Sequence, residues 1–161
     1  MAYHYFISVK GAKQGEFKGE NGKKPGVIPI LGFSSGVTSP RDVATGQASG
    51  RRQHRPITII KEWGEVSVQF FQALVTNEVL SPVDIRAVRT DASGKEQVYM
   101  EIHLTDVAVS GIQIDPVVET HDHASLPSDA ENERIELTFR KIEIENKVSR
   151  TAASDDWEAR V

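Results

Sequence analysis

The sequence contains no cysteine among its 161 residues. A disulfide framework and a thiol nucleophile are therefore both excluded. It also lacks a run of about 18 apolar residues, the length that a membrane-spanning helix requires. The opening stretch, MAYHYFISVKG, has no apolar core followed by a cleavage site, so it predicts no secretory signal peptide. We expect a cytoplasmic protein which, if it is exported, leaves the cell without such a signal.

An excess of basic charge is also missing. The formal net charge is -4 and the isoelectric point is about 5.7. General nucleic-acid binding normally needs a basic field, and the one basic run, GRRQHR at residues 50–55, has no interleaved aromatic side chains on which bases could stack. The hydrophobic and charged fractions, 39% and 26%, are ordinary for a globular protein. We therefore predict a single domain over residues 1–161, ending in a polar tail at 147–161, with neither nucleic acid nor a membrane as a partner.

Catalytic motifs are weak. His121 and His123 flank Asp122, and alternate residues of an extended strand can direct two imidazoles to one side, but no third ligand stands at a fitting spacing. His103 shares its expected face with Glu101 and could be half of an acid–base pair, although such a residue is more often simply hydrogen-bonded at a sheet surface. No serine lies in a Gly-x-Ser-x-Gly turn. The sequence thus predicts no enzyme, no cofactor and no metal site.

Alternation of apolar and polar residues dominates what is present, and it predicts β-strands along most of the chain. Pro29 and Gly32 interrupt the second of these, which is typical of a strand at the edge of a sheet. The expected strands are residues 3–10, 27–37, 56–63, 83–90 and 96–115, with a turn at 91–94 and a break near Ser110–Gly111, and a last strand at about 133–147.

One stretch changes to the helical period. Residues 67–77, SVQFFQALVTN, place Phe70, Phe71, Leu74 and Val75 on one stripe, so we expect these four to be buried. Ser67 is a plausible N-cap residue. At about eleven residues the helix is too short to be stable alone and must lie against the sheets.

The last strand changes parity. Ile135, Leu137 and Phe139 share one face, whereas Ile142 and Ile144 share the other, so we predict a β-bulge near residues 140–141. Together the elements predict a mainly β fold: a β-barrel of two packed antiparallel sheets with one short flanking helix and a long extended loop at about 38–55. Trp157 is the one anchor candidate in the polar tail.

The long loop is the most unusual stretch, because it holds few residues that could be buried and is too long for an ordinary hairpin turn. Ordering each residue costs roughly 1–2 kcal/mol of backbone entropy, so the loop is either disordered or ordered against something outside its own domain. We favour a polar contact between copies of the chain. The residues that we predict for this contact are Ser39, Pro40, Arg41, Asp42, Arg51, Arg52, Gln53, His54 and Arg55.

A family resemblance extends over essentially the whole chain. It is carried, in order, by FISVKGAKQGEF, TSPRDVATGQASGRRQHRPITIIKEW, FFQALVTNEVL, VRTDASG, LTFRKIEIENK and the DDWEA that follows. The most specific piece is SGRRQHRPITIIKEW, followed by the helix with paired phenylalanines. In these features the sequence resembles the Hcp family, the tube proteins of bacterial type VI secretion systems.

The resemblance implies a structural function. Hcp-family subunits are β-barrels with one flanking helix, which close into six-membered rings that stack into a tube fired into another cell. It further implies tube-tip spike, sheath and effector proteins as partners, and a loop at Thr38–Arg55 that reaches adjacent subunits or rings. The alternatives are the tube protein of a related contractile machine or phage-like tail, and a stand-alone ligand-binding β-domain, which would be a monomer with a polar-lined pocket.

Overall fold

The computed structural model describes residues 3–18, 27–115 and 131–157, and these are mainly β-structure with a single helix. The expected mainly β class is therefore confirmed. The elements are β1 (Tyr3–Gly11), β2 (Gly15–Glu16), β3 (Ile28–Ile30), β4 (Gly32–Ser34), β5 (Val37–Thr38), β6 (Gln53–His54), β7 (Ile57–Glu62), α1 (Glu65–Thr76), β8 (Leu80–Thr90), β9 (Glu96–Thr105), β10 (Ala108–Asp115), β11 (Asn132–Thr138), β12 (Lys141–Asn146) and β13 (Thr151–Asp156).

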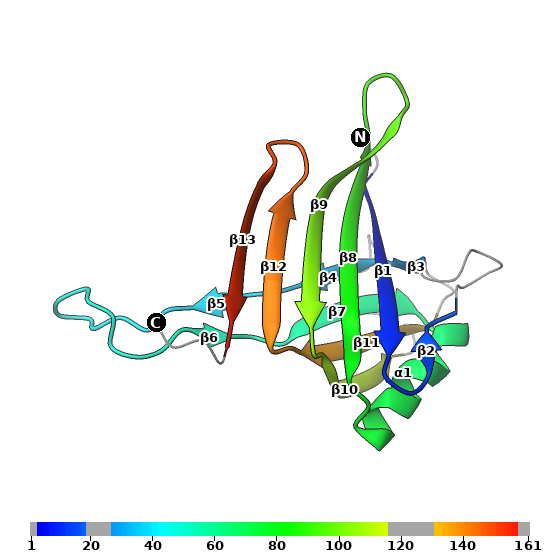
Figure 1. Ribbon diagram of the computed structural model, residues 1–161, viewed down its shortest axis with the longest axis horizontal. Helices are drawn as coiled ribbons and strands as arrows, with labels where there is room; N and C mark the ends of the chain where they lie inside the picture. The colour runs from blue at the N-terminus through cyan, green and yellow to red at the C-terminus, as the bar shows by residue number, and fades with distance from the viewer. Residues whose placement is uncertain (1–2, 19–26, 116–130, 158–161) are drawn as a thin grey trace.

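Two antiparallel sheets pack face to face. The larger has seven strands in the order β13-β12-β9-β8-β1-β2, with β3 also paired to β1, and the smaller has the order β10-β11-β7-β4. Strands of the smaller sheet run across those of the larger one, and α1 lies beside the end where the two meet (Figure 1). Among the described residues the strand pairings do not close into one ring, although Leu80 of β8 and Val107, just before β10, exchange two backbone hydrogen bonds where the sheets meet.

The core lies between the two sheets, because alternate residues of each strand are apolar and point to the same side. The larger sheet contributes Ile7, Val83, Ile85 and Leu104, and the smaller sheet contributes Ile57, Ile59, Ile135 and Leu137, all buried. Phe17 and Phe70 add an edge-to-face pair with ring centroids 5.1 Å apart. The helix thus covers one end of the same apolar cluster.

Two expected continuous strands divide between the sheets. The stretch at 27–37 splits at Leu31 into β3, on the larger sheet, and β4, on the smaller. Pro29 lies in an outer strand that, among the described strands, pairs with β1 alone, as the proline predicted. The stretch at 96–115 breaks at Asp106, which has a φ of 53°. The shift expected near Ser110 is also present, as an irregularity between Val109 and Gly111.

The last strand and the tail also differ from expectation. A bulge was predicted near residues 140–141, but the chain leaves the smaller sheet after Thr138 and enters the larger one at Lys141. The change of parity therefore marks a change of sheet. Residues 151–156 of the tail, for which no strand was predicted, pair with β12 as an added edge strand, although their side chains are polar or small.

The helix begins two residues earlier than predicted. Gly64, not Ser67, is the N-cap residue, and the helix ends at Thr76, after which the C-cap residue Asn77 adopts the left-handed conformation. Val66, Phe70 and Ala73 face the core at helical spacing, which rotates Phe71 and Val75 towards solvent, where they are 57% and 56% exposed. The expectation that these two side chains are buried was wrong. Within the described part of the chain, no helix has the length and apolar character to cross a membrane.

A buried ion pair fixes the start of the helix. Lys61 Nζ donates to Glu133 Oε1 at 3.2 Å, and both side chains are almost completely buried. Ser67 joins them, because its hydroxyl donates to Glu133 Oε1 at 2.6 Å and accepts from the Gly64 N–H at 2.9 Å. This network ties β7, β11 and the first turn of α1 together.

A second buried carboxylate organises the turn between β1 and β2. Glu78, just after the helix, accepts the backbone N–H groups of Lys13 at 3.2 Å and Gln14 at 3.0 Å. Gly11 makes room for it, because a Cβ at that position would lie 2.0 Å from Glu78 Oε2. Glycine is therefore required at residue 11 by close approach.

Replacing Lys61 with methionine should lower the free energy of unfolding by about 3–5 kcal/mol, because Glu133 would be left buried without its cation. Urea unfolding measures the effect, and the exposed Lys13→Met is the matched control. The double variant Lys61→Met/Glu133→Leu should recover at least half of the loss. Equal instability of the single and double variants would contradict this explanation.

Gly11→Ala should lower the free energy of unfolding by about 1–3 kcal/mol, since the Glu78 carboxylate would have to move away from two backbone donors. Gly32→Ala is the control, because no atom lies within 4 Å of the added Cβ. It should change stability by less than about 0.5 kcal/mol in the same unfolding experiment. A similar loss in both variants would show that the contact with Glu78 is not the cause.

Candidate functional site

The long loop forms a hairpin arm, defined here as residues 37–54, that projects away from the two sheets (Figure 1). Its first and last residues pair as β5 and β6, Val37 with His54 and Thr38 with Gln53. Further out, Arg41 and Ala48 form a β-bridge, beyond which the chain reverses at Gly46 with a φ of 73°. We call residues 41–48 the tip and residues 37–38 and 53–54 the base.

The base is tied to the C-terminal strand by an anchor, defined as the contacts of Arg52 and His54 with Asp155. Arg52 Nε donates to Asp155 Oδ2, and Arg52 Nη2 donates to the Asp156 carbonyl at 2.8 Å. His54 Nε2 lies 2.6 Å from the same Asp155 oxygen. Arg51 adds a bond to the Trp157 carbonyl at 2.9 Å. Residues about a hundred positions apart in the chain are thereby joined at one point.

Charge and apolar contact reinforce each other in the anchor. The hydrogen bonds from Arg52 and His54 lower the pKa of Asp155 from 3.8 to about 2, and the Asp155 carboxylate raises the pKa of Arg52. The His54 ring also packs between aromatic neighbours, with centroids 5.4 Å from Phe139 and 5.3 Å from Trp157. The base is therefore held by packing as well as by charge.

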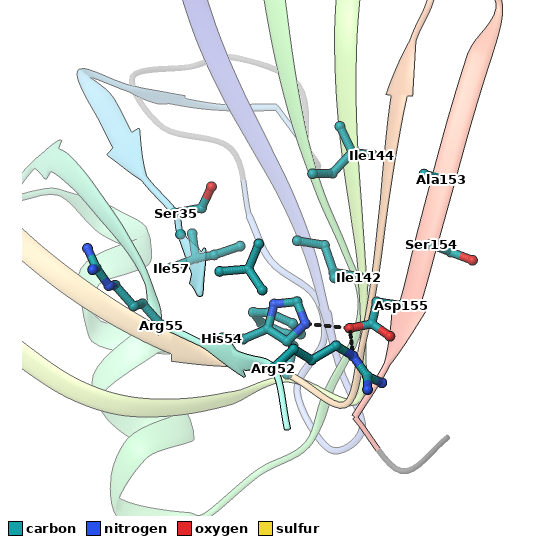
Figure 2. Close-up of a pocket in the computed structure, with 13 residues that line it drawn as sticks. Ser35, Arg52, His54, Arg55, Ile57, Ile142, Ile144, Ala153, Ser154 and Asp155 are labelled. Atoms are coloured by element: carbon teal, nitrogen blue, oxygen red, sulfur yellow. Dashed lines mark hydrogen bonds and ion pairs between the residues drawn. The ribbon is translucent and has the colours of Figure 1, made fainter. Parts of the chain in front are cut away.

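A cavity of about 360 Å³ lies between the base and strands β7, β12 and β13. Figure 2 shows Ile142 and Ile144 directed towards it, with Arg55 on one side and Arg52 and Asp155 on the other. We call it the base pocket. Its lining residues are Ser35, Gly36, Val37, Arg52, His54, Arg55, Ile57, Phe139, Ile142, Ile144, Ala153, Ser154 and Asp155. Its walls are mainly apolar and its rim carries charge.

The structure separates the predicted contact residues into two groups. Ser39, Pro40, Arg41 and Asp42 lie on the outward part of the arm, whereas Arg51, Arg52, Gln53, His54 and Arg55 lie at or beside its base. The arginines were expected to face another molecule, but Arg51 and Arg52 bind the C-terminal segment of their own chain. Arg55 lines the base pocket instead.

Sequence reasoning missed Asp155 and Asp156 as partners of the arm. Trp157 was identified as an anchor, and the structure places it against His54. The only signal for the carboxylates was their position immediately before that tryptophan, which gives no information about a partner so distant in the chain.

A second charged cluster lies on the outer face of the larger sheet. His103 Nδ1 is 2.6 Å from Asp84 Oδ1, and its Nε2 is 3.1 Å from Glu101 Oε2 and 3.5 Å from Glu145 Oε2. Burial alone would lower the pKa of His103, but the hydrogen bond and charge of Asp84, together with Glu145 and Glu101, outweigh it and raise that pKa.

The cluster can hold a proton, and its three ligand-type residues Glu101, His103 and Glu145 are close enough to surround a cation. Lys147 Nζ already lies 3.2 Å from Glu145 and 3.6 Å from Glu101, so both carboxylates have a cationic partner. The arrangement is that of a surface ion-pair network, as expected for a hydrogen-bonded histidine on a sheet. The other histidine candidates, His121 and His123, lie outside the described residues.

Comparisons with known proteins agree on one family. Residues 6–145 match the family described as "Type VI secretion system effector, Hcp". The "Major exported protein" of Pseudomonas aeruginosa is 30% identical over 179 aligned residues, covering 100% of this chain and 99% of that protein. The secreted protein Hcp3 from Pseudomonas aeruginosa is 26% identical, with a TM-score of 0.77, and covers 98% of this chain and 100% of its own. A crystal structure of an Hcp protein gives a TM-score of 0.85 at 24% identity, covering 98% of this chain and 100% of that chain.

Replacing Asp155 with asparagine should weaken the anchor in a pH-dependent way. Because folding lowers the pKa of Asp155, its charge stabilises the folded state above about pH 4, and that contribution disappears as the pH falls towards 2. The variant should be less stable than the wild type by about 1 kcal/mol or less near neutral pH, since solvent screens the pair.

Urea unfolding at several pH values measures this difference, with Glu143→Gln on the adjacent strand as the control. The stability gap should narrow between about pH 4 and pH 2 for Asp155→Asn. A gap that stays constant over this range would show that the carboxylate charge is not what holds the arm.

Proposed function

The chain belongs to the Hcp family of type VI secretion proteins, and we propose that it is a tube subunit that closes into six-membered rings which stack. The observation that carries this proposal is the arm, which projects from the sheets yet is fixed at its base (Figure 1). A fixed arm has lost most of its backbone freedom before any partner arrives, so docking costs little further entropy. The arm is thus suited to contact another copy.

Ring closure requires two different complementary surfaces on each subunit, because a head-to-tail ring repeats one heterologous contact. The larger sheet offers two outer edges, β13 on one side and β2 with β3 on the other. In β13 the side chains of Thr151 and Ala152 are small and exposed, so a neighbouring strand could approach closely. We assign ring closure to these edges and stacking to the arm.

The proposed tube function also implies the partners of the protein and its location in the cell. We infer that the subunit is made in the cytoplasm, assembles there with itself and with sheath, spike and effector proteins, and is then exported. The name of the Pseudomonas aeruginosa relative, an exported protein, supports the export step. The activity is assembly, so we propose no catalytic residue, cofactor or metal.

A ligand-binding role remains the second candidate, because the base pocket is apolar and falls in the size range of small-molecule sites, about 300–1,000 Å³. A role of this kind predicts a monomer that binds its ligand in the pocket. The proposed tube function predicts an oligomer, and one experiment separates the two.

The native mass of the purified protein should correspond to six subunits or to multiples of six, and negative-stain images should show rings with a central hole. A variant in which residues 41–48 are replaced by Asn-Gly should still form rings but not stacks, because it keeps the anchor and loses the tip. A monomer at all concentrations would refute the tube function. Stacking by the shortened variant would refute the role of the arm.

A further inference from the structure

The tip of the arm carries an apolar side chain with nothing to cover it. Val43 is fully exposed, the most exposed large hydrophobic residue of the described chain. Its neighbour Asp42 uses one carboxylate oxygen, Oδ1, to accept the Ala44 N–H at 2.8 Å. The tip therefore presents an apolar side chain next to an acidic one, on a segment that projects from the body (Figure 1).

The base of the arm has an apolar pocket and a positive charge that complement the tip. The base pocket has apolar walls formed by Ile57, Ile142 and Ile144 and a volume of about 360 Å³. Arg55 borders it, held by its backbone N–H bond to the Gly36 carbonyl at 2.8 Å and by its Cδ, which packs over Gly36. With the residues that the structure describes, the Arg55 guanidinium forms no hydrogen bond or ion pair. Arg52 binds Asp155, whereas the charge of Arg55 is available to pair with a carboxylate of another molecule.

We propose that the tip of one arm inserts Val43 into the base pocket of a second copy, where Asp42 pairs with Arg55. The inference rests on the proposed function and names the receiving surface for the arm. Burying the valine removes its apolar surface from water, and the ion pair at the rim fixes the direction of entry.

The occupant must come from another copy. The tip and the base are opposite ends of one antiparallel hairpin, held apart by the β5–β6 pairing and the bridge between Arg41 and Ala48. A contact between the end of one hairpin and the base of the next is heterologous, so it can repeat without limit. Such a contact extends an assembly along an axis, as stacking of rings requires.

The absence of cysteine makes a direct test possible. In the double variant Val43→Cys/Ala153→Cys, one thiol is at the tip and the other is in the pocket wall, since Ala153 pairs with Ile144 on the pocket side of β12. Mild oxidation of the assembled protein should give a ladder of covalently linked chains on a non-reducing gel. Each single-cysteine variant should give no more than linked dimers.

Charge exchange tests the ion pair. Asp42→Arg and Arg55→Asp should each abolish stacking while rings persist by native mass, and the double variant should restore it. Lys95→Asp, in the turn between β8 and β9, is the matched control and should stack like the wild type.

Rings or tubes that form without a covalent ladder would overturn the tip-to-pocket contact and leave the ring proposal standing. Single charge variants that stack normally would also overturn it. A wild-type protein that remains monomeric would overturn the inference together with the proposed function. A covalent ladder from the cysteine variant, together with restored stacking in the Asp42→Arg/Arg55→Asp variant, would establish both the tip-to-pocket contact and the proposed function.

Discussion

The carboxylate of Asp155 is the point on which the arm depends. The base of the arm has only two paired residues on each side, and so short a ribbon is marginal by itself in water. Arg52 and His54 both bind Asp155 Oδ2, and the surrounding aromatic rings exclude water from one side of the contact. One interaction therefore fixes the arm, closes one wall of the base pocket and holds the edge strand β13 against the arm.

The fold follows from alternation in the strands and from where that alternation breaks. Strand positions, the turn with Gly94 and the mainly β class could be predicted, because a period of two in apolar residues is a local signal. The assignment of strands to sheets could not, since a parity change at residues 139–141 is equally consistent with a bulge and with a change of sheet. Helix burial was wrong at Phe71 because Val66 and Ala73, one turn before and after Phe70, centre the buried stripe on Phe70, and Phe71 lies about 100° around the helix from it.

The candidate site was predictable in its location and not in its contacts. A long polar stretch between two strands indicated the arm, and its composition indicated a polar contact. The partner of Arg52 and His54 lies about a hundred residues away, in a segment of small and polar residues whose local sequence does not predict a strand. Whether Asp155 comes close to Arg52 and His54 depends on which sheet β12 joins, because β13 pairs with β12. No local sequence pattern indicates that sheet. The contacts of Arg51 and Arg52 with the C-terminal segment of their own chain were therefore not predicted.

Three charged networks in this protein differ in burial, and burial sets what each can do. The Lys61–Glu133 pair is shielded from solvent, so it acts on stability and fixes how α1 meets the sheets. The His103 cluster is partly exposed and its glutamates are already paired with Lys147 and Arg86, so it contributes little to either stability or recognition. The anchor is also partly exposed, but its His54 ring packs against Phe139 and Trp157, so the anchor holds the arm in one direction and Arg55 beside it remains available. Since an arm that is already ordered has little entropy left to lose, even a small contact at its tip can join copies, and a small contact can also be broken when the assembly comes apart.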